Sequence, residues 1–130
     1  MKELVDRFVE MERAIASERG EFWLFALFLR EDARDRWDLV VSAPWIEVDP
    51  KAALQYLAKQ VQVRFQPSEA ETLSRIVLVD QENPALGAIN GAIRVEHGTA
   101  EVQDSNFFGL SIEHAYVITS KGPEVDITAS

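Results

Sequence analysis

Residues 22–29 read Phe-Trp-Leu-Phe-Ala-Leu-Phe-Leu, and residues 37–43 read Trp-Asp-Leu-Val-Val-Ser-Ala. The first run is apolar at every position, which is typical of a central strand buried on both faces of a sheet. The second run also has the composition of a strand and ends at Pro44. The charged link at 31–36 is short enough to favour an antiparallel hairpin. These two runs predict the centre of a sheet.

Helical periodicity is found on both sides of this hairpin. Upstream, a predicted amphipathic helix that stops near Gly20 has its apolar stripe at Leu4, Phe8, Met11 and Ile15. This stripe either packs on the domain's own sheet or forms the seam of a dimer. Downstream, Asp49-Pro50 predicts an N-cap followed by proline at the first helical position. The stripe of this second helix is expected at Leu54, Leu57 and Val61.

The remaining sequence is expected to add strands and short helical turns. Residues 76–79 are too few and too β-branched for anything but a buried strand. Further strands are expected at 92–96, 99–103 and 110–120, and short turns at 68–71 and after Asn83-Pro84. The predicted fold is α+β, with a mostly antiparallel sheet of five to six strands and two main helices packed on one face. We expect a single domain over residues 1–120 and a loosely ordered tail over 121–130.

The composition narrows the range of functions. The chain has 130 residues, 13 basic and 22 acidic side chains, a net charge of −9 and no cysteine. Disulfides, thiolate metal sites and cysteine nucleophiles are therefore excluded. The charge disfavours general binding to nucleic acid or anionic lipid. Because residues 66–130 hold 3 basic and 10 acidic side chains, any nucleic-acid contact is expected in the first half, at Arg30, Arg34, Arg36 and Lys51.

The sequence shows no targeting or membrane-spanning pattern. Its longest apolar run has eight residues, whereas a transmembrane helix needs about 20. The opening residues Met-Lys-Glu-Leu-Val-Asp place acids where a signal peptide has a basic and then an apolar region. We therefore expect a cytoplasmic protein without a membrane partner.

Motifs that define common cofactor and catalytic sites are missing. The sequence contains no G-x-G-x-x-G, no P-loop, no G-x-S-x-G elbow and no H-E-x-x-H. Since His97 and His114 are its two histidines, a histidine-rich metal site is excluded, whereas a mixed carboxylate–histidine site is not. The sequence therefore predicts no cofactor and assigns no metal ligand.

One acidic pattern points to phosphodiester chemistry. Asp38 lies in a predicted strand, and an acid-x-lysine triplet follows about ten residues later at Asp49 and Lys51. This spacing resembles that of the PD-(D/E)xK nucleases. The resemblance implies that the two carboxylates hold Mg²⁺ and that the lysine polarises the attacking water. A further acid would come from the first helix, at Glu12 or Glu18.

These acids also have purely structural interpretations. Asp38 is placed to cap a strand or to pair with Arg34 or Arg36, and Asp49 is placed as an N-cap. Asp80 follows the buried strand at 76–79, where a sheet often presents a catalytic acid, but it also begins a polar turn. Both interpretations therefore stay open for each acid.

The histidines are weaker candidates. His114 alternates strictly with Leu110, Ile112, Tyr116 and Ile118, which places it on their face and Thr119 on the opposite one. It is either a neutral, hydrogen-bonded core residue or a general base, and a base would need an orienting carboxylate. His97, beside Gly98, is expected to be a turn residue.

Aromatic residues outside the main apolar runs either form a partner surface or are buried under loops or a helix. Phe107 and Phe108 are adjacent and therefore point to opposite faces of a strand, and Trp45 lies in the Pro44-Trp-Ile46 corner. Our leading hypothesis is a non-catalytic interaction or assembly module that binds a protein, with self-association as a homodimer. The alternatives are the Mg²⁺-dependent nuclease and a small-ligand domain with a pocket lined by Trp23, Trp37 and Phe108.

Overall fold

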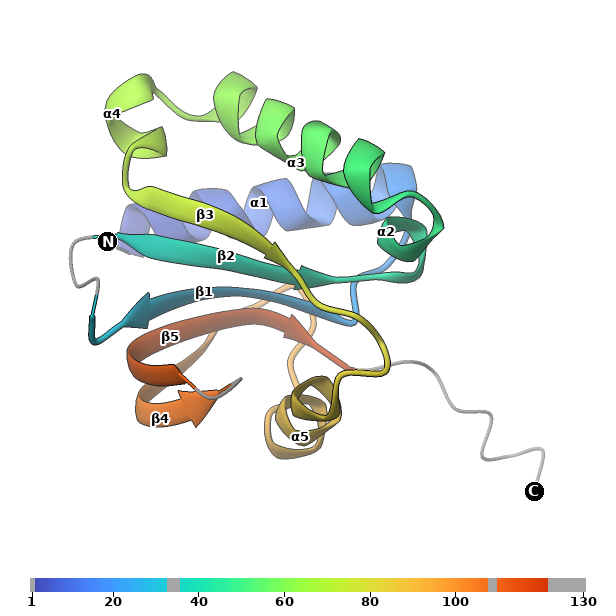
Figure 1. Ribbon diagram of the computed structural model, residues 1–130. Coiled ribbons are helices and arrows are strands. Elements are labelled where there is room, and N and C mark those ends of the chain that lie inside the picture. The colour runs from blue at the N-terminus through green and yellow to red at the C-terminus, as the bar shows by residue number, and fades with distance from the viewer. Residues whose placement is uncertain (1, 33–35, 108–109, 122–130) are drawn as a thin grey trace.

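The computed structural model describes residues 2–32, 36–107 and 110–121 and has an α+β fold built on a five-stranded mixed sheet (Figure 1). The strand order across the sheet is β3-β2-β1-β5-β4. The strands are β1 (Leu24–Arg30), β2 (Trp37–Ser42), β3 (Leu73–Leu78), β4 (Ala100–Phe107) and β5 (Leu110–Ser120). The helices are α1 (Lys2–Arg19), α2 (Pro44–Val48), α3 (Pro50–Arg64), α4 (Pro67–Ala70) and α5 (Pro84–Ala92).

The predicted hairpin forms the centre of the sheet. β1 pairs antiparallel with β2 on one side and with β5 on the other, and its residues 24–28 are buried. β4 pairs antiparallel with β5, whereas β3 is parallel to β2. The parallel pair arises because α3 and α4 form a long crossover between β2 and β3, and only such a connection allows parallel pairing. The sheet is therefore mixed: three of its pairings are antiparallel, and the β2–β3 pairing is parallel.

The two long helices lie side by side on one face of the sheet (Figure 1). Phe8, Met11 and Ile15 of the predicted α1 stripe are at most 2% exposed and Leu4 is partly buried. These side chains pack in one cluster with Phe25, Leu27 and Leu39 of the sheet. The stripe of α1 therefore packs on the domain's own sheet. In α3 the buried positions are Ala53, Leu57 and Val61, so Leu54, which is 39% exposed, was assigned to the wrong face.

α5 covers the opposite face of the sheet. Leu86 and Ile89 of this helix join a second core cluster with Phe28, Val40 and Val117. Because β1 is apolar on both faces, its second face needs a cover, and α5 supplies it. The sequence predicted only a short turn here. Within the described residues, none of the helices has the length and hydropathy needed to cross a bilayer.

Strand β5 breaks the strict alternation that its sequence predicts. Phe25 pairs with Thr119 and Ala26 with Val117, so Ile118 is an extra residue in β5. A bulge of this kind re-aims the neighbouring side chain, and Thr119 consequently bonds to α1 on the same side as Ile118. The prediction that Thr119 and Ile118 lie on opposite faces is therefore wrong.

The other boundary differences are small. A second register shift, at Arg30, leaves Ile112 in the α5-side cluster while His114 stacks on Tyr116 of the other face. The strand expected at 92–96 is reduced to one bridge between Val95 and Ser120. Of the predicted tail, Lys121 is described and residues 122–130 lie outside the described residues.

Candidate functional site

Asp38 is a buried partner of two arginines. It is 3% exposed, and its Oδ2 lies 3.1 Å from Arg30 Nε and 3.2 Å from Arg75 Nε. The arginines come from β1 and β3, the two strands that flank β2. The ion pairing expected of this acid is present, although with these partners rather than Arg36, while Arg34 lies outside the described residues.

The fold does not bring the nuclease-like residues together. Asp38 lies near the start of β2, on the α5 side of the sheet, whereas Asp49 lies beyond the end of β2 and α2. Asp49 Oδ1 accepts a 3.1 Å hydrogen bond from Ala52 N, which makes it the N-cap of α3 on the opposite layer. Lys51 is exposed in the first turn of α3. The position of Asp49 therefore favours its role as a helix N-cap over a role as a metal ligand.

Asp80 and His114 have local partners. Asp80 is exposed, and its Oδ1 accepts a hydrogen bond from the backbone N–H of Glu82, as in a turn. The His114 ring stacks on Tyr116 with 4.7 Å between centroids, and its Nε2 lies 2.8 Å from Glu101 Oε2. Glu101 is the carboxylate partner that the sequence did not reveal, because it comes from the neighbouring strand β4.

The predicted aromatic surfaces are separated. Trp23 packs with the α5-side core, and Trp37 packs with the α1-side core, so these two rings do not line one pocket. Phe108 lies outside the described residues, and so does the side chain of Phe107 at the end of β4. Of the three residues proposed as a binding surface, Trp45 is the one whose side chain the structure describes.

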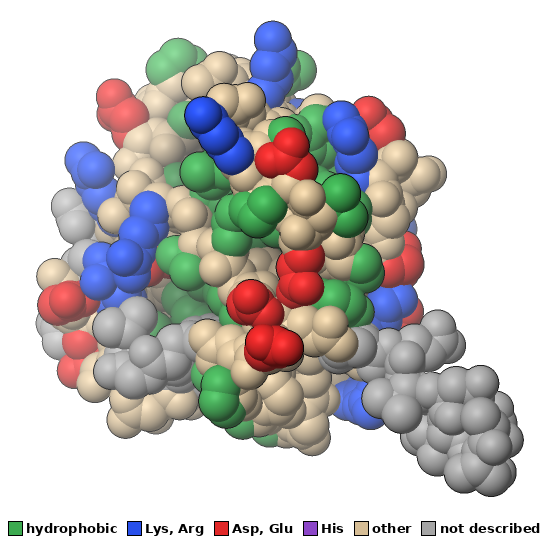
Figure 2. All heavy atoms as spheres, turned by 45° about the vertical axis from the view of Figure 1, so that its right-hand side comes forward, with side chains coloured by type: hydrophobic (Ala, Val, Ile, Leu, Met, Phe, Trp, Pro, Cys, Tyr) green, Lys and Arg blue, Asp and Glu red, His purple; other side chains and the backbone are tan. Residues whose placement is uncertain are grey.

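Trp45 lines a cavity of about 480 Å³. The cavity lies where the last turn of α1, the helix α2 and the first turns of α3 meet, and its lining is Glu18, Arg19, Trp45, Val48, Asp49, Ala52, Ala53 and Tyr56. The Trp45 and Tyr56 rings meet edge to face, with centroids 5.8 Å apart. The space-filling view, which brings the α2 side forward, shows hydrophobic side chains at the surface among acidic and basic ones (Figure 2).

The sequence around Trp45 explains how the cavity is held open. Pro44 starts α2 directly after β2, which turns the chain sharply and projects Trp45 toward α1 and α3. Gly20 ends α1 with φ +125°, a conformation that side-chain-bearing residues rarely adopt, and a Cβ there would lie 3.4 Å from Trp45 Cδ1. Glycine therefore lets the α1–β1 connection run close beneath the indole ring.

The cavity combines the charged side chains of Glu18, Arg19 and Asp49 with the polar groups of Trp45 and Tyr56. The Arg19 guanidinium carbon lies 4.2 Å from the centre of the Tyr56 ring, a cation–π geometry. Burial is the main cause that raises the pKa of the Tyr56 hydroxyl, so this group stays protonated at neutral pH. The indole Nε1–H of Trp45 is buried and has no hydrogen-bond acceptor within the described part of the chain. An unpaired buried donor of this kind costs about 1–3 kcal/mol.

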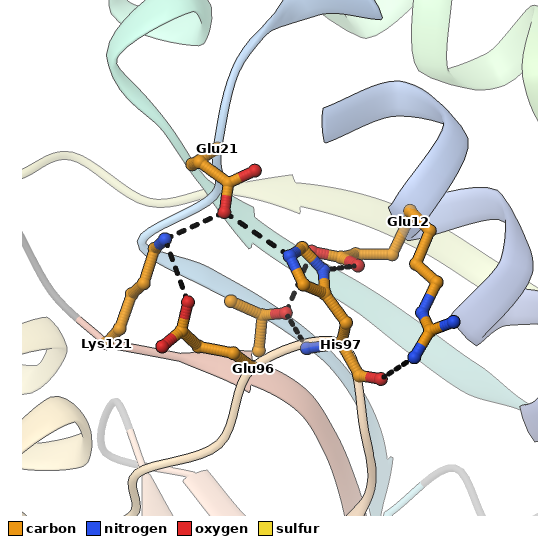
Figure 3. A network of polar contacts seen from close by, with 7 residues as sticks. Glu12, Glu21, Glu96, His97 and Lys121 are labelled. Carbon is orange, nitrogen blue, oxygen red and sulfur yellow. Dashed lines mark hydrogen bonds and ion pairs between the residues drawn. The ribbon is translucent and has the colours of Figure 1, made fainter. Parts of the chain in front are cut away.

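A second polar site surrounds His97, next to the same α1–β1 connection (Figure 3). Glu12 of α1 is 0% exposed, and its Oε1 lies 2.6 Å from His97 Nδ1. The Thr119 hydroxyl donates a 2.8 Å hydrogen bond to the other carboxylate oxygen of Glu12. The backbone of His97 has φ 50° and is held by Thr119 Oγ1 and by the Arg13 guanidinium. The His97 ring therefore has a fixed orientation.

The outer nitrogen of His97 faces a pair of carboxylates. Nε2 lies 3.3 Å from Glu21 Oε1, and Lys121 Nζ donates to Glu21 Oε1 at 2.7 Å and to Glu96 Oε1 at 3.2 Å (Figure 3). The hydrogen bond to Glu12 is the main cause that raises the pKa of His97, and the bond from Lys121 is the main cause that lowers the pKa of Glu21. The carboxylates of Glu21 and Glu96 therefore lie on either side of the Lys121 ammonium group, next to the His97 ring.

Sequence reasoning missed this network almost entirely. His97 was expected to be a turn residue, and Glu12 entered only as a further acid for the nuclease hypothesis. A signal was present, because Glu12 follows Phe8 by four residues and so lies on the buried stripe of α1. Glu21, Glu96 and Lys121 are brought together by the fold and carried no local signal.

The His97 network predicts a pH dependence of stability. The pKa of His97 in the fold is above its ordinary value of 6.5, so the protonated ring favours the folded state. Its contribution is fully present below pH 6.5 and is lost as the pH rises through the raised pKa. Urea denaturation between about pH 6 and about pH 9 measures this loss. His97→Gln is expected to remove that part of the pH dependence and His114→Gln to retain it; an unchanged slope in His97→Gln would contradict the assignment.

Comparisons of the chain with models of known protein families, with curated proteins and with solved structures find no match in any of the three.

Proposed function

We propose that this protein is a binding module without catalytic activity and that its Trp45 cavity takes an apolar or aromatic group from a partner protein. The observation that carries the proposal is the cavity itself, which is walled by the Trp45 and Tyr56 rings and has the unpaired indole N–H of Trp45 in its wall. Its volume of about 480 Å³ falls within the range of small-ligand and side-chain pockets.

The rim supports binding to an apolar group. Val48 lies at the edge of the cavity and is 86% exposed. Covering this apolar side chain with a partner would be favourable, because it would remove apolar surface from water. Glu18, Arg19 and Asp49 surround the aromatic wall and supply charged groups at the margin. An apolar centre with a polar rim is the usual anatomy of a protein-binding site.

Catalysis has less support than binding. Asp38 lies on the opposite layer of the fold from Asp49 and already forms ion pairs with two arginines. Of the further acids considered for the nuclease set, Glu18 lines the same cavity as Asp49, without Asp38. A general base at His114 would have to compete with its ring stack and its ion pair to Glu101. We therefore place the binding module first.

An NMR titration with N-acetyl-L-tryptophanamide as the probe tests the proposal. The chain has three tryptophans, whose indole N–H resonances are assignable by single Trp→Phe variants. The probe is expected to shift the Trp45 resonance in a saturable manner and to leave the Trp23 resonance in place. Shifts that never saturate, or that are equal at all three tryptophans, would contradict the proposal.

Two matched valine variants locate the effect at the rim. Val48 and Val63 are both exposed at helix ends, at 86% and 71%, but Val63 lies at the far end of α3 from the cavity. Val48→Lys is expected to weaken probe binding about tenfold, or about 1.4 kcal/mol, because it places a charge beside the apolar wall. Val63→Lys should leave the affinity unchanged; equal losses in both variants would rule out a specific rim.

A second copy of the chain is the protein partner to test first. The edge of β4 is a poor surface for pairing, because Glu101 and Asp104 are exposed there and Asp104 has φ 49° in mid-strand. We propose that self-association uses the cavity rather than the β4 edge. Sedimentation over a range of micromolar concentrations should then show a dimer that Val48→Lys dissociates and Val63→Lys does not. A monomer throughout would assign the cavity to a different protein.

A further inference from the structure

We propose that Glu21, Glu96 and His97 form a binding site for a divalent transition-metal ion such as Zn²⁺, with Lys121 as a cationic group that the metal displaces. Among the described residues these three form a group whose nitrogen and oxygen ligand atoms all lie within 4.8 Å of one another. One imidazole and two carboxylates are a donor set suited to zinc, which binds nitrogen and oxygen ligands tetrahedrally.

The orientation of the His97 ring is typical of a metal-binding histidine. Metal-binding histidines almost always donate their second ring N–H to a carboxylate or carbonyl, which fixes the tautomer and the ring plane. Here Nδ1 lies 2.6 Å from the wholly buried Glu12, and Nε2 faces outward to Glu21. Glu12 is itself fixed by the Thr119 hydroxyl, so the ring is held before any metal arrives.

The distances fit a metal with a modest adjustment. Zinc bonds of about 2.0–2.1 Å place tetrahedral ligands about 3.3–3.4 Å apart. His97 Nε2 and Glu21 Oε1 are separated by 3.3 Å. Glu96 lies within 4.8 Å and its side chain is 58% exposed, so it is free to close the remaining gap by a rotamer change. With three protein ligands, the fourth position would be left to water or another group.

Lys121 marks the point at which a cation is stabilised. Its Nζ lies 2.7 Å from Glu21 and 3.2 Å from Glu96, between the two carboxylates that would bind the metal. A divalent ion at the same point would repel the ammonium group, and the lysine must swing into solvent. Lys121 therefore competes with the metal, and its removal should strengthen metal binding.

Isothermal titration of the protein with ZnCl₂ tests the site. We expect one saturable site per chain in the wild-type protein. Glu96→Gln is expected to weaken it at least tenfold, and Lys121→Met to tighten it about tenfold, which corresponds to about 1.4 kcal/mol. Glu96 and Lys121 are partly exposed, so neither variant is expected to unfold the chain.

The second glutamate–histidine pair provides the matched control. Glu101 lies 2.8 Å from His114 but belongs to no group of three metal-ligating side chains within the described residues. Glu101→Gln should therefore leave zinc affinity unchanged, and zinc should shift the NMR signals of the His97 ring rather than those of His114. The absence of saturable binding in both wild type and Lys121→Met, or equal losses in Glu96→Gln and Glu101→Gln, would overturn the proposal.

Discussion

His97→Ala is expected to lower the free energy of unfolding by about 3–5 kcal/mol. The substitution removes the partner of a carboxylate that is 0% exposed and leaves Glu12 with the Thr119 hydroxyl as its remaining hydrogen-bond partner among the described residues. An uncompensated buried charge is far more costly than the loss of the contact itself. Urea denaturation at neutral pH, followed by circular dichroism, measures the change.

Two further variants distinguish this explanation from loss of packing. Adding Glu12→Leu to His97→Ala removes the buried carboxylate that has lost its partner. The double variant should therefore be more stable than His97→Ala alone. Glu101→Gln removes the charge of the corresponding pair with His114 and leaves the stack of His114 on Tyr116 in place. Because the Glu101 side chain is 48% exposed, this variant should cost no more than about 1 kcal/mol. Equal losses in His97→Ala and the double variant would show that Glu12 is not the source of the cost.

Asp38→Ala is expected to destabilise the fold by about 3 kcal/mol, the lower end of the range for breaking a buried ion pair. The carboxylate is 3% exposed and is the shared partner of Arg30 and Arg75. The value is at the lower end because the Arg75 side chain is 49% exposed and keeps access to water. The same denaturation measurement applies.

Asp32 is the control for Asp38. It also lies near Arg30, at 3.5 Å, but its side chain is 73% exposed. Asp32→Ala should therefore change the stability by less than about 1 kcal/mol. If Asp38→Ala proved as stable as the wild type, the ion pairs would contribute little, and a ligand-binding role for Asp38 would regain support.

The centre of the fold was predictable because its signals are local. The wholly apolar run at 22–29 and the short link to 37–43 correctly predicted a central hairpin, and Asp49-Pro50 correctly predicted the N-cap of α3. These features depend on side-chain periodicity and capping, both of which are properties of neighbouring residues.

The sequence-based predictions were wrong where the backbone geometry depends on contacts between segments that are distant in the chain. A bulge inserts Ile118 into β5 and turns Thr119 toward α1, and nothing in the strand's alternating pattern predicts it. The parallel pairing of β3 follows from the crossover through α3 and α4, which sequence periodicity does not specify. Both depend on how distant segments meet.

The candidate sites divide in the same way. The sequence marked Trp45 as a candidate because an aromatic residue in a proline corner is a local feature, whereas the cavity that Trp45 lines also depends on α1 and α3. The His97 network joins α1, the α1–β1 connection, the loop before β4 and the end of β5. Of its residues, Glu12 is the one that the sequence indicates, because it lies on the apolar stripe of α1.

The location of a bound aromatic group decides whether the Trp45 cavity is a binding site. Intermolecular nuclear Overhauser effects between N-acetyl-L-tryptophanamide and the protein report which side chains contact the probe. If the cavity is the binding site, the ring protons of the probe should give contacts to Trp45, Tyr56 and Ala52, which line it. Contacts confined to residues outside this lining would contradict the account.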